Sequence, residues 1–507
     1  MKSKASDAKK FWGIFGIGCG LFVLSLDWSI VNNALPSIQK SLNTSFSQLQ
    51  WIMNIFALAI AVLLVTMGRL ADAFGRKKLF IFGLGLAAIA SLGAALSPTP
   101  LVLIMFRLLQ GASAATIVTS SQSLITHAFP ENMHGKAMGI WATIIGAGLS
   151  FGPVLGGLII QFFSWHWIFF FNIPALLISF LIVTPLAEES RNHKQPAHID
   201  FPGISLFILT LGSFVFATIQ APIWGWSSPV IKALYIFATL TMGIFIFVEC
   251  RVKSPLIEFH LFKNKKFFAG ALTKFALVFM VWGIFFLMPL YFQNIQKKTP
   301  AESGLLLLAI TLSFTFASHL AGRFSDRINK KYFLWIGLSL VIFTLLFQLC
   351  FQKDTSTLFF VIFFIFLGLG WGLSSGPGSS MGIASLPRHV SGVASGTLVT
   401  VQEVGGAIGL SVVGTVFKAS ENAYFENQLH LSNLNLSPES LSRIQSLLSS
   451  SDQFFSSLSH YPVPLQKTIT TLFQDSFMHG LHRGLWVVIG VMFVSLCLIF
   501  LFTRRES

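Results

Sequence analysis

The sequence predicts an all-α integral membrane protein made of two related six-helix bundles plus two extra central spans. The 507-residue chain is 54% hydrophobic and 10% charged, with a mean hydropathy of +0.73, which is typical of proteins that live in a bilayer. Fourteen apolar stretches are each long enough to cross a hydrocarbon core of about 30 Å as a helix. One polar loop pattern also occurs twice, at matching places in the two halves of the chain.

The expected spans follow one another in the order six, two and six. They lie near residues 11–35, 49–70, 79–97, 101–127, 137–160, 167–186, 201–221, 229–249, 267–290, 303–321, 332–351, 357–383, 392–416 and 484–503. This order predicts an N-terminal bundle (1–187), a cytoplasmic linker with the two inserted spans (188–266), and a C-terminal bundle (267–507) with a long extracytoplasmic loop (417–483). Most Lys and Arg residues fall in loops on one side of this map, so we expect both termini in the cytoplasm.

The repeated loop pattern reads GRLADAFGRKK at 68–78 and GRFSDRINKK at 322–331. In each copy a Gly-Arg pair closes an apolar run, an Asp stands at the fifth position, and basic residues precede the next apolar run. Such a loop joins two membrane helices on the cytoplasmic side, and its repetition in both halves is typical of alternating-access transporters. We expect gating loops built from Gly68, Asp72, Gly75, Arg76, Gly322, Asp326 and Arg327.

Charge and cysteine content argue against other classes of protein. The net charge of +15 is spread over short loops rather than gathered on one face, so we expect no nucleic-acid partner. The four cysteines stand singly, without the spacing of a disulfide framework or a metal site. A membrane enzyme would need a nucleophile, metal or acid-base motif, and the chain carries none of the usual ones. A channel would need a filter, whereas the glycines here have helix-packing spacing.

The long extracytoplasmic loop has its own helix signals. Ser437, Pro438 and Glu439 predict a helix start, and residues 465–478 could form an amphipathic helix before the last span. Two interpretations stay open: a solvated connector, or a docking surface or outer lid.

Polar side chains inside the spans are rare, and an ionisable group at bilayer depth costs about 3 kcal/mol or more unless it faces a cavity or a partner. Asp27 stands in the first span, within LDWSIVNNALP at 26–36, and Arg107 opens RLLQGASAA in the fourth span. Asp27 either carries a proton or makes a static bond between helices. Arg107 either assists proton transfer or clamps backbone carbonyls.

The fifth span carries glycines at helical spacing. Gly148, Gly152 and Gly156 lie on one face, and Pro153 removes one backbone hydrogen bond, so this helix can pack tightly and bend. At an offset of 257 residues the thirteenth span repeats the glycines, but Glu403 stands in the place of Gly146. Glu403, with Gln402 beside it, is therefore a second buried acid, either a proton carrier or the counter-charge for a cationic substrate.

Five stretches resemble the major facilitator superfamily and, within it, the fourteen-span drug:proton antiporters. They are the loop at 68–78, with Ala73 where that family usually has Arg; the first-span stretch at 26–36, with Asn33 in place of a small apolar residue; the fourth-span stretch at 107–115; the fifth-span glycine run, which resembles the antiporter motif; and WHWIFFFNIP at 165–174, with His166 where Arg is common. The resemblance covers nearly the whole chain and implies the major facilitator fold.

The resemblance implies a proton-coupled antiporter of the cytoplasmic (inner) membrane that exports hydrophobic or amphipathic compounds, as in multidrug efflux. We expect Asp27, Arg107 and Glu403 to couple protons, where Glu403 rests on its buried position rather than on the resemblance. We expect the substrate cavity to contain Asp27, Trp28, Asn32, Asn33, Gln110, Gln402 and Glu403. The antiporter motif implied by the resemblance is Gly148, Gly152, Pro153, Gly156 and Gly157. The partners are a small-molecule substrate, protons and the lipid bilayer, and no cofactor or metal is expected beyond the proton gradient. A periplasmic adaptor with an outer-membrane channel stays open as a partner.

The alternative function is transport of a specific metabolite, siderophore or organic ion by a member of the same superfamily. A facilitator-type importer is less favoured, because it would be expected to lack the glycine run of the fifth span and to carry more polar cavity residues.

Overall fold

A computed structural model describes residues 2–129, 134–190, 200–252, 255–325, 327–387, 390–431 and 463–504, and these ranges contain helices and loops without a strand. The helices are α1 (Lys2–Leu42), α2 (Phe46–Phe74), α3 (Arg76–Ala95), α4 (Pro100–His127), α5 (His134–Phe162), α6 (His166–Phe170), α7 (Asn172–Leu186), α8 (Phe201–Trp224), α9 (Pro229–Glu249), α10 (Lys265–Leu290), α11 (Pro300–Phe324), α12 (Lys330–Gln348), α13 (Thr357–Ala384), α14 (Ser391–Leu431) and α17 (Val463–Arg504). With α6 and α7 taken as one span, fourteen helical spans of the described chain are long and apolar enough to cross a membrane. The predicted all-α fold and number of spans are confirmed.

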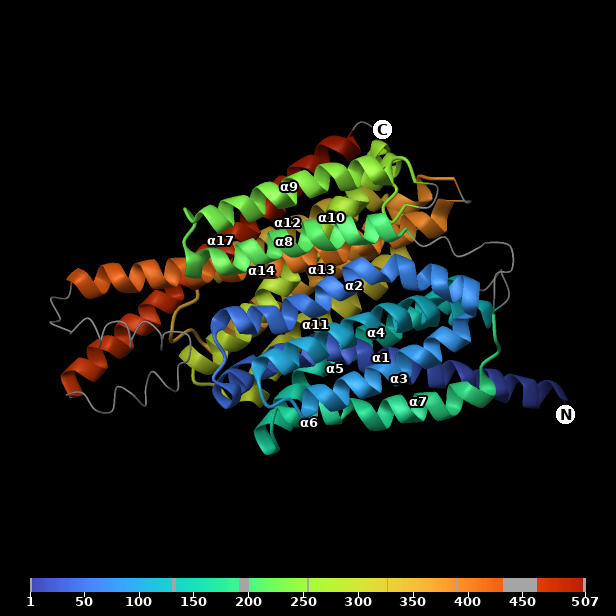
Figure 1. The fold of residues 1–507 in the computed structure, drawn as a ribbon, viewed down its shortest axis with the longest axis horizontal. Coiled ribbons are helices and arrows are strands. Elements are labelled where there is room, and N and C mark those ends of the chain that lie inside the picture. Colours follow the sequence, from blue (N-terminus) through green and yellow to red (C-terminus); the bar gives the residue numbers. More distant parts are fainter. Residues whose placement is uncertain are drawn as a thin grey trace.

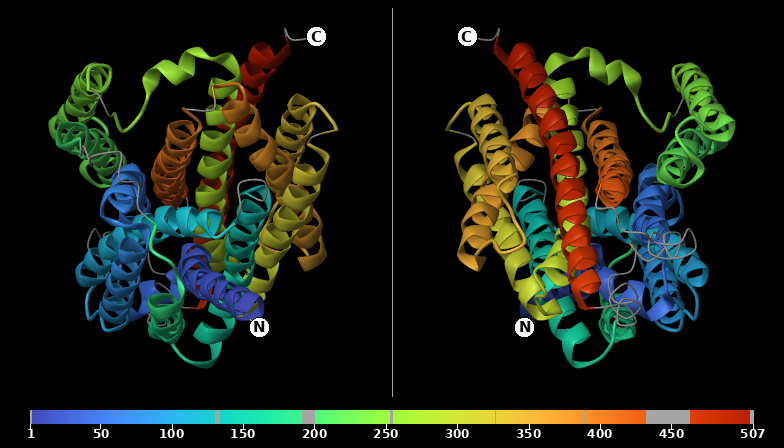
Figure 2. Two further views of the ribbon diagram at one scale, coloured as in Figure 1. Left: turned by 90° about the vertical axis from the view of Figure 1, so that its right-hand side faces the viewer. Right: turned by 90° about the vertical axis from the view of Figure 1, so that its left-hand side faces the viewer.

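The helices run side by side along one axis, and both ends of the chain lie at the same end of the bundle (Figure 1). We name this the terminal end and the opposite one, where α1 turns into α2, the far end. Viewed along the helices, α1–α7 and α10–α17 form two groups, and α8 and α9 stand at the edge of the bundle (Figure 2). There α8 contacts α2 of the first group and α14 of the second. The inserted pair therefore touches both halves.

The two halves use the same local signals at the same places. Helix α2 begins after a capping box in which Ser45 N donates to Gln48 Oε1 (2.9 Å) and Gln48 N donates to Ser45 Oγ (3.3 Å). Helix α11 begins after the same device, made by Thr299 and Glu302. Each box satisfies backbone N–H groups that a helix start leaves without partners. Ser45 and Thr299 are separated by the same 254 residues that separate Gly68 and Gly322.

Glycines set the closest helix contacts in both halves. A Cβ on Gly148 would lie 2.7 Å from the Phe22 carbonyl oxygen of α1, and a Cβ on Gly405 would lie 2.5 Å from the Phe275 carbonyl oxygen of α10. The next glycine of each run, Gly152 or Gly409, meets the carbonyl oxygen four residues further along α1 or α10. The contacts of α5 with α1 therefore recur between α14 and α10, in the register that the sequence predicts.

The two halves contact each other at the far end of the bundle, through the glycine-containing helices α5 and α14. A Cβ on Gly157 of α5 would lie 2.4 Å from the Pro300 carbonyl oxygen of α11, and a Cβ on Gly414 of α14 would lie 2.4 Å from Gln50 Nε2 of α2. Gln50 Nε2 also donates to the Ser411 carbonyl oxygen (3.3 Å). These contacts close the halves against each other at the far end.

The structure of α14 and α17 differs from one expectation about the long loop at 417–483. Residues 465–478 do not form a separate helix before the last span, because α17 is continuous from Val463 to Arg504. Helix α14 likewise continues to Leu431, and 41 residues make a helix of about 60 Å, twice the thickness of a hydrocarbon core. Both helices extend beyond the far end of the bundle (Figure 1). The helix start expected at Ser437 lies outside the described residues.

We predict that Gly148→Ala destabilises the protein by about 1–3 kcal/mol, because the added Cβ would meet backbone atoms of α1 that have no room to move. The measurement is the melting temperature of purified protein in detergent. The matched control is Gly212→Ala in α8, where nothing lies within 4 Å of the added carbon. Equal melting temperatures of both variants would contradict the close contact of α1 with α5.

Candidate functional site

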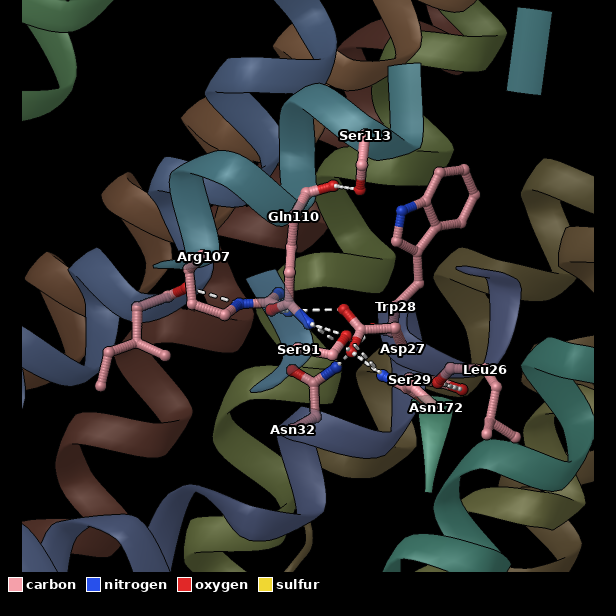
Figure 3. Close-up of polar contacts among 11 residues, drawn as sticks. Leu26, Asp27, Trp28, Ser29, Asn32, Ser91, Arg107, Gln110, Ser113 and Asn172 are labelled. Atoms are coloured by element: carbon pink, nitrogen blue, oxygen red, sulfur yellow. Dashed lines mark hydrogen bonds and ion pairs between the residues drawn. The ribbon is translucent and has the colours of Figure 1, made fainter. Parts of the chain in front are cut away.

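Asp27 and Arg107 form an ion pair in the middle of the N-terminal half. Asp27 lies on α1 and Arg107 on α4, and their residues are 3% and 0% exposed. Arg107 Nη1 donates to Asp27 Oδ2 at 2.5 Å (Figure 3). Charge-assisted hydrogen bonds are the strong ones, and here no solvent screens the pair. The structure thus brings together the two groups that the sequence could only place on separate spans.

The guanidinium of Arg107 makes three further contacts. Its Nε donates to the Ile52 carbonyl oxygen (3.2 Å), and its Nη1 donates to Gln110 Oε1 (3.0 Å). Its carbon Cζ lies 4.1 Å from the centre of the Phe56 ring, a cation–π contact. Arg107 therefore clamps a backbone carbonyl, which is one of the two roles left open by the sequence, and it also pairs with Asp27.

The second carboxylate oxygen of Asp27 is held by side-chain amides. Asn172 Nδ2 donates to Asp27 Oδ1 (3.2 Å), and Gln110 Nε2 lies 3.5 Å from the same oxygen. Both amides also donate to Ser91 Oγ, at 3.5 and 3.1 Å respectively (Figure 3). We call Asp27, Ser91, Arg107, Gln110 and Asn172 the Asp27 network.

Asn172 and Ser91 were not among the predicted site residues. Asn172 begins α7, inside the stretch at 165–174 that resembles the family, so the sequence held a signal for it. Ser91 is one of many serines in apolar spans, and nothing in the sequence singles it out.

A small cavity of about 20 Å³ lies beside Asp27, large enough for one water molecule. Its lining is Val23, Leu24, Asp27, Phe56, Ala87, Ser91, Gln110, Ser113, Ile117, Asn172 and Leu176. All these residues belong to the N-terminal half. The cavity thus gives Asp27 room for a water molecule, and it is too small for an organic substrate.

The other predicted cavity residues of α1 lie in two different settings. The Trp28 indole N–H and Asn32 Oδ1 are buried and have no hydrogen-bond partner within the described part of the chain, so both are available to a ligand. Asn33 is not, because its Nδ2 donates to the carbonyl oxygens of Pro153 (3.2 Å) and Pro300 (2.7 Å). The structure places Asn33 between the two halves at the far end.

Glu403 lies apart from the Asp27 network, on α14 of the other half. It is 2% exposed, and Gln402 Nε2 donates to its Oε1 at 3.1 Å. Its Oε2 has no hydrogen-bond partner among the described residues. Lys274 of α10 interacts with it electrostatically while its Nζ donates to Ser375 Oγ (3.2 Å). Lys274 therefore places a basic group near Glu403 in the same half.

The first gating loop has contacts within itself and with the start of the linker that follows the N-terminal bundle. Arg76 pairs with Asp72 (Nη2–Oδ1, 2.9 Å), and Glu189 accepts from the backbone N–H groups of Lys77 and Lys78 at the start of α3. Gly75 joins α2 to α3 at φ +115°, a conformation that favours glycine. In this arrangement the described partner of Asp72 is thus Arg76 of the same loop, whereas the halves contact each other at the far end.

The second gating loop, at 322–331, is described only in part. Gly322 has open space around it and Arg327 is exposed, whereas Asp326 lies outside the described residues. Within the described chain, no group of three or more His, Cys, Asp and Glu side chains could hold a metal ion.

Comparison with known proteins identifies the family to which this chain belongs. The model of the Major Facilitator Superfamily matches residues 17–410. The chain is 31% identical to the multidrug resistance protein Stp of Mycobacterium tuberculosis over 417 residues, which are 82% of this chain and 77% of that protein. It is 29% identical to the tetracenomycin C resistance and export protein of Streptomyces glaucescens (83% and 78% covered), and 27% identical to the riboflavin transporter RibZ of Clostridioides difficile (81% and 89% covered).

Among solved structures, a bacterial homolog of the human lysosomal transporter Spinster, crystallised in an inward-facing and unoccupied conformation, has the same fold. The TM-score is 0.68 at 12% sequence identity, over 98% of this chain and 97% of that one. Together with its fourteen apolar spans and its two related halves, these matches show that the chain is a multi-pass membrane protein and a transporter of the major facilitator superfamily.

Proposed function

We propose that this protein is a proton-coupled antiporter that exports hydrophobic or amphipathic compounds by alternating access. The observation that carries the proposal is the Asp27 network, a buried carboxylate paired with Arg107 and held by two amides. In this proposal the terminal end faces the cytoplasm, in agreement with the basic loops there. The cytoplasmic membrane is then the site of action.

The network can bind and release a proton as its surroundings change. Burial disfavours the charged carboxylate, and a neighbouring guanidinium favours it. In this proposal, contact with Arg107 favours release of the proton, and movement of Arg107 away from Asp27 favours its uptake. The two states thus differ in the contact between α1 and α4, which is how proton binding can bias a movement of the halves.

The glycine contacts between the halves indicate which helices separate when the protein changes its conformation. In the present arrangement α5 packs against α11, and α14 packs against α2, through glycines at the far end. Closure at the far end together with an ionised Asp27 fits the stage after the proton has left toward the cytoplasm. Opening of the far end would then expose the site for export and for the next proton.

The nature of the cargo rests on two observations. Relatives are named for resistance to, or export of, antibiotics, and the available polar groups of α1, the Trp28 indole and the Asn32 carbonyl, are few. Both favour a largely apolar compound. A specific metabolite is the second candidate, because one relative is named as a riboflavin transporter. A periplasmic adaptor with an outer-membrane channel stays a prediction.

We predict that Asp27→Asn abolishes substrate efflux driven by a proton gradient in proteoliposomes, and that slow exchange of substrate without a gradient persists. The amide cannot bind and release a proton, yet it keeps the shape of the carboxylate. The control is Asp475→Asn, which changes a side chain on α17 that is 46% exposed. Gradient-driven efflux at the normal rate in Asp27→Asn would show that the proton is carried elsewhere.

Glu403→Gln separates two roles of the second buried acid. If Glu403 balances the charge of a cationic substrate, the variant should lose transport of cations and keep transport of neutral compounds; an equal loss of both identifies a proton carrier. The measurement is the efflux of a cationic dye and a neutral dye by the same proteoliposomes. Glu426→Gln, an exposed change on the same helix, is the control and should leave both unchanged. Normal transport of both dyes by Glu403→Gln would exclude both roles.

A further inference from the structure

Two acidic residues lie at the ends of the inserted helices, at the terminal end of the bundle. Asp200 caps α8, and its Oδ1 accepts from Gly203 N at 2.9 Å. Glu249 is the last residue of α9, and its Oε2 accepts from Ile257 N at 2.9 Å. The two residues are only 5% and 3% exposed. Each carboxyl group is thus fixed through one oxygen by a backbone N–H.

The remaining oxygens face the same small space. Asp200 Oδ2 and Glu249 Oε1 lie 2.4 and 2.3 Å from the point that a Cβ on Gly203 would occupy. Neither atom has a donor among the described residues, although the two side chains are within hydrogen-bonding reach of each other. Ionised carboxylates only accept hydrogen bonds, whereas a protonated one donates. A single proton would therefore supply the hydrogen bond that both oxygens lack.

The charges around the pair favour one proton rather than none or two. Arg69, near the end of α2, interacts electrostatically with Asp200, Glu249 and Glu258. Glu258 in turn lies 3.5 Å from His260 (Oε2–Nε2). With one proton, the pair keeps a single negative charge to balance Arg69. With none, two buried like charges would be in contact, which is strongly unfavourable.

The pair lies where three parts of the chain meet. Arg69 Nη2 donates to the Pro255 carbonyl oxygen (2.6 Å), which ties α2 of the N-terminal half to the segment that leads into α10. Further along α8, the Thr218 carbonyl oxygen accepts from Thr415 Oγ1 of α14 (2.9 Å). Movement of the halves therefore acts on the inserted helices from both sides.

We propose that Asp200 and Glu249 together bind one proton, and that this second proton site holds the inserted helices to the end of α2 and to the segment before α10. The proton comes from the aqueous side at the terminal end and is shared between Asp200 Oδ2 and Glu249 Oε1. Its loss leaves two carboxylates that repel each other, and this loosens α8 from α9. The site is separate from Asp27 and does not depend on the export function proposed above.

The first test is infrared difference spectroscopy of the purified protein at mildly acidic and mildly alkaline pH, in an Asp27→Asn, Glu403→Gln background that removes the two other candidate proton carriers. We expect a carboxylic-acid C=O band that disappears as the pH rises. Adding Glu249→Gln should remove this band, whereas adding Glu258→Gln, a change in the neighbouring ion pair, should leave it. A band that survives Glu249→Gln, or the absence of any such band, overturns the proposal.

The second test uses transport by the protein with native Asp27. In Glu249→Gln the new amide donates to Asp200 at every pH and so imitates the protonated pair. As the pH at the terminal end is raised at a constant gradient, the efflux rate of the unmodified protein should change more than that of Glu249→Gln, in which the proton carrier Asp27 is still present but the acidic pair is not. Asp200→Asn, which puts the amide on the other partner, serves if Glu249→Gln does not fold. A folded variant whose efflux depends on pH in the same way as that of the unmodified protein would contradict the proposal.

Discussion

Asp27 and Arg107 meet in the middle of an apolar bundle, where neither charge is stable without the other. Leaving one partner of a buried ion pair alone costs about 3–5 kcal/mol, so in the present arrangement the pair holds α1 and α4 in register. The amide groups of Gln110 and Asn172 add donors from α4 and α7. One electrostatic requirement thus constrains most of the N-terminal half.

The two halves share a scaffold and differ in their chemistry. The glycine contacts of α5 with α1 recur between α14 and α10, because close approach of backbones needs small residues in both places. The ion pair does not recur. Glu403 instead stands on α14, where the first half has Gly146, and interacts electrostatically with Lys274. The two bundles therefore share their helix packing and differ in their buried charges.

The inserted helices α8 and α9 add a third element at the edge of this scaffold (Figure 2). They contact both halves, and their ends at Asp200 and Glu249 meet the N-terminal half through Arg69. This position is suited to sensing the relative movement of the halves, because small displacements change how two buried carboxyl groups face each other. An acidic pair there would respond to the solution at the terminal end, whereas Asp27 is enclosed by the bundle.

The sequence by itself determined the membrane class, the number of spans, the repeated loops and the glycine register, because hydropathy and helical spacing are local properties. It also identified Asp27, Arg107 and Glu403 as buried charges. Only the tertiary structure decided their partners, since Asp27 lies 80 residues from Arg107 and 145 from Asn172 in the chain. It also placed Asn33 against Pro153 and Pro300 at the junction of the halves, and it brought Asp200 against Glu249. Contacts between helices depend on how the whole bundle packs, and local sequence patterns do not specify this packing.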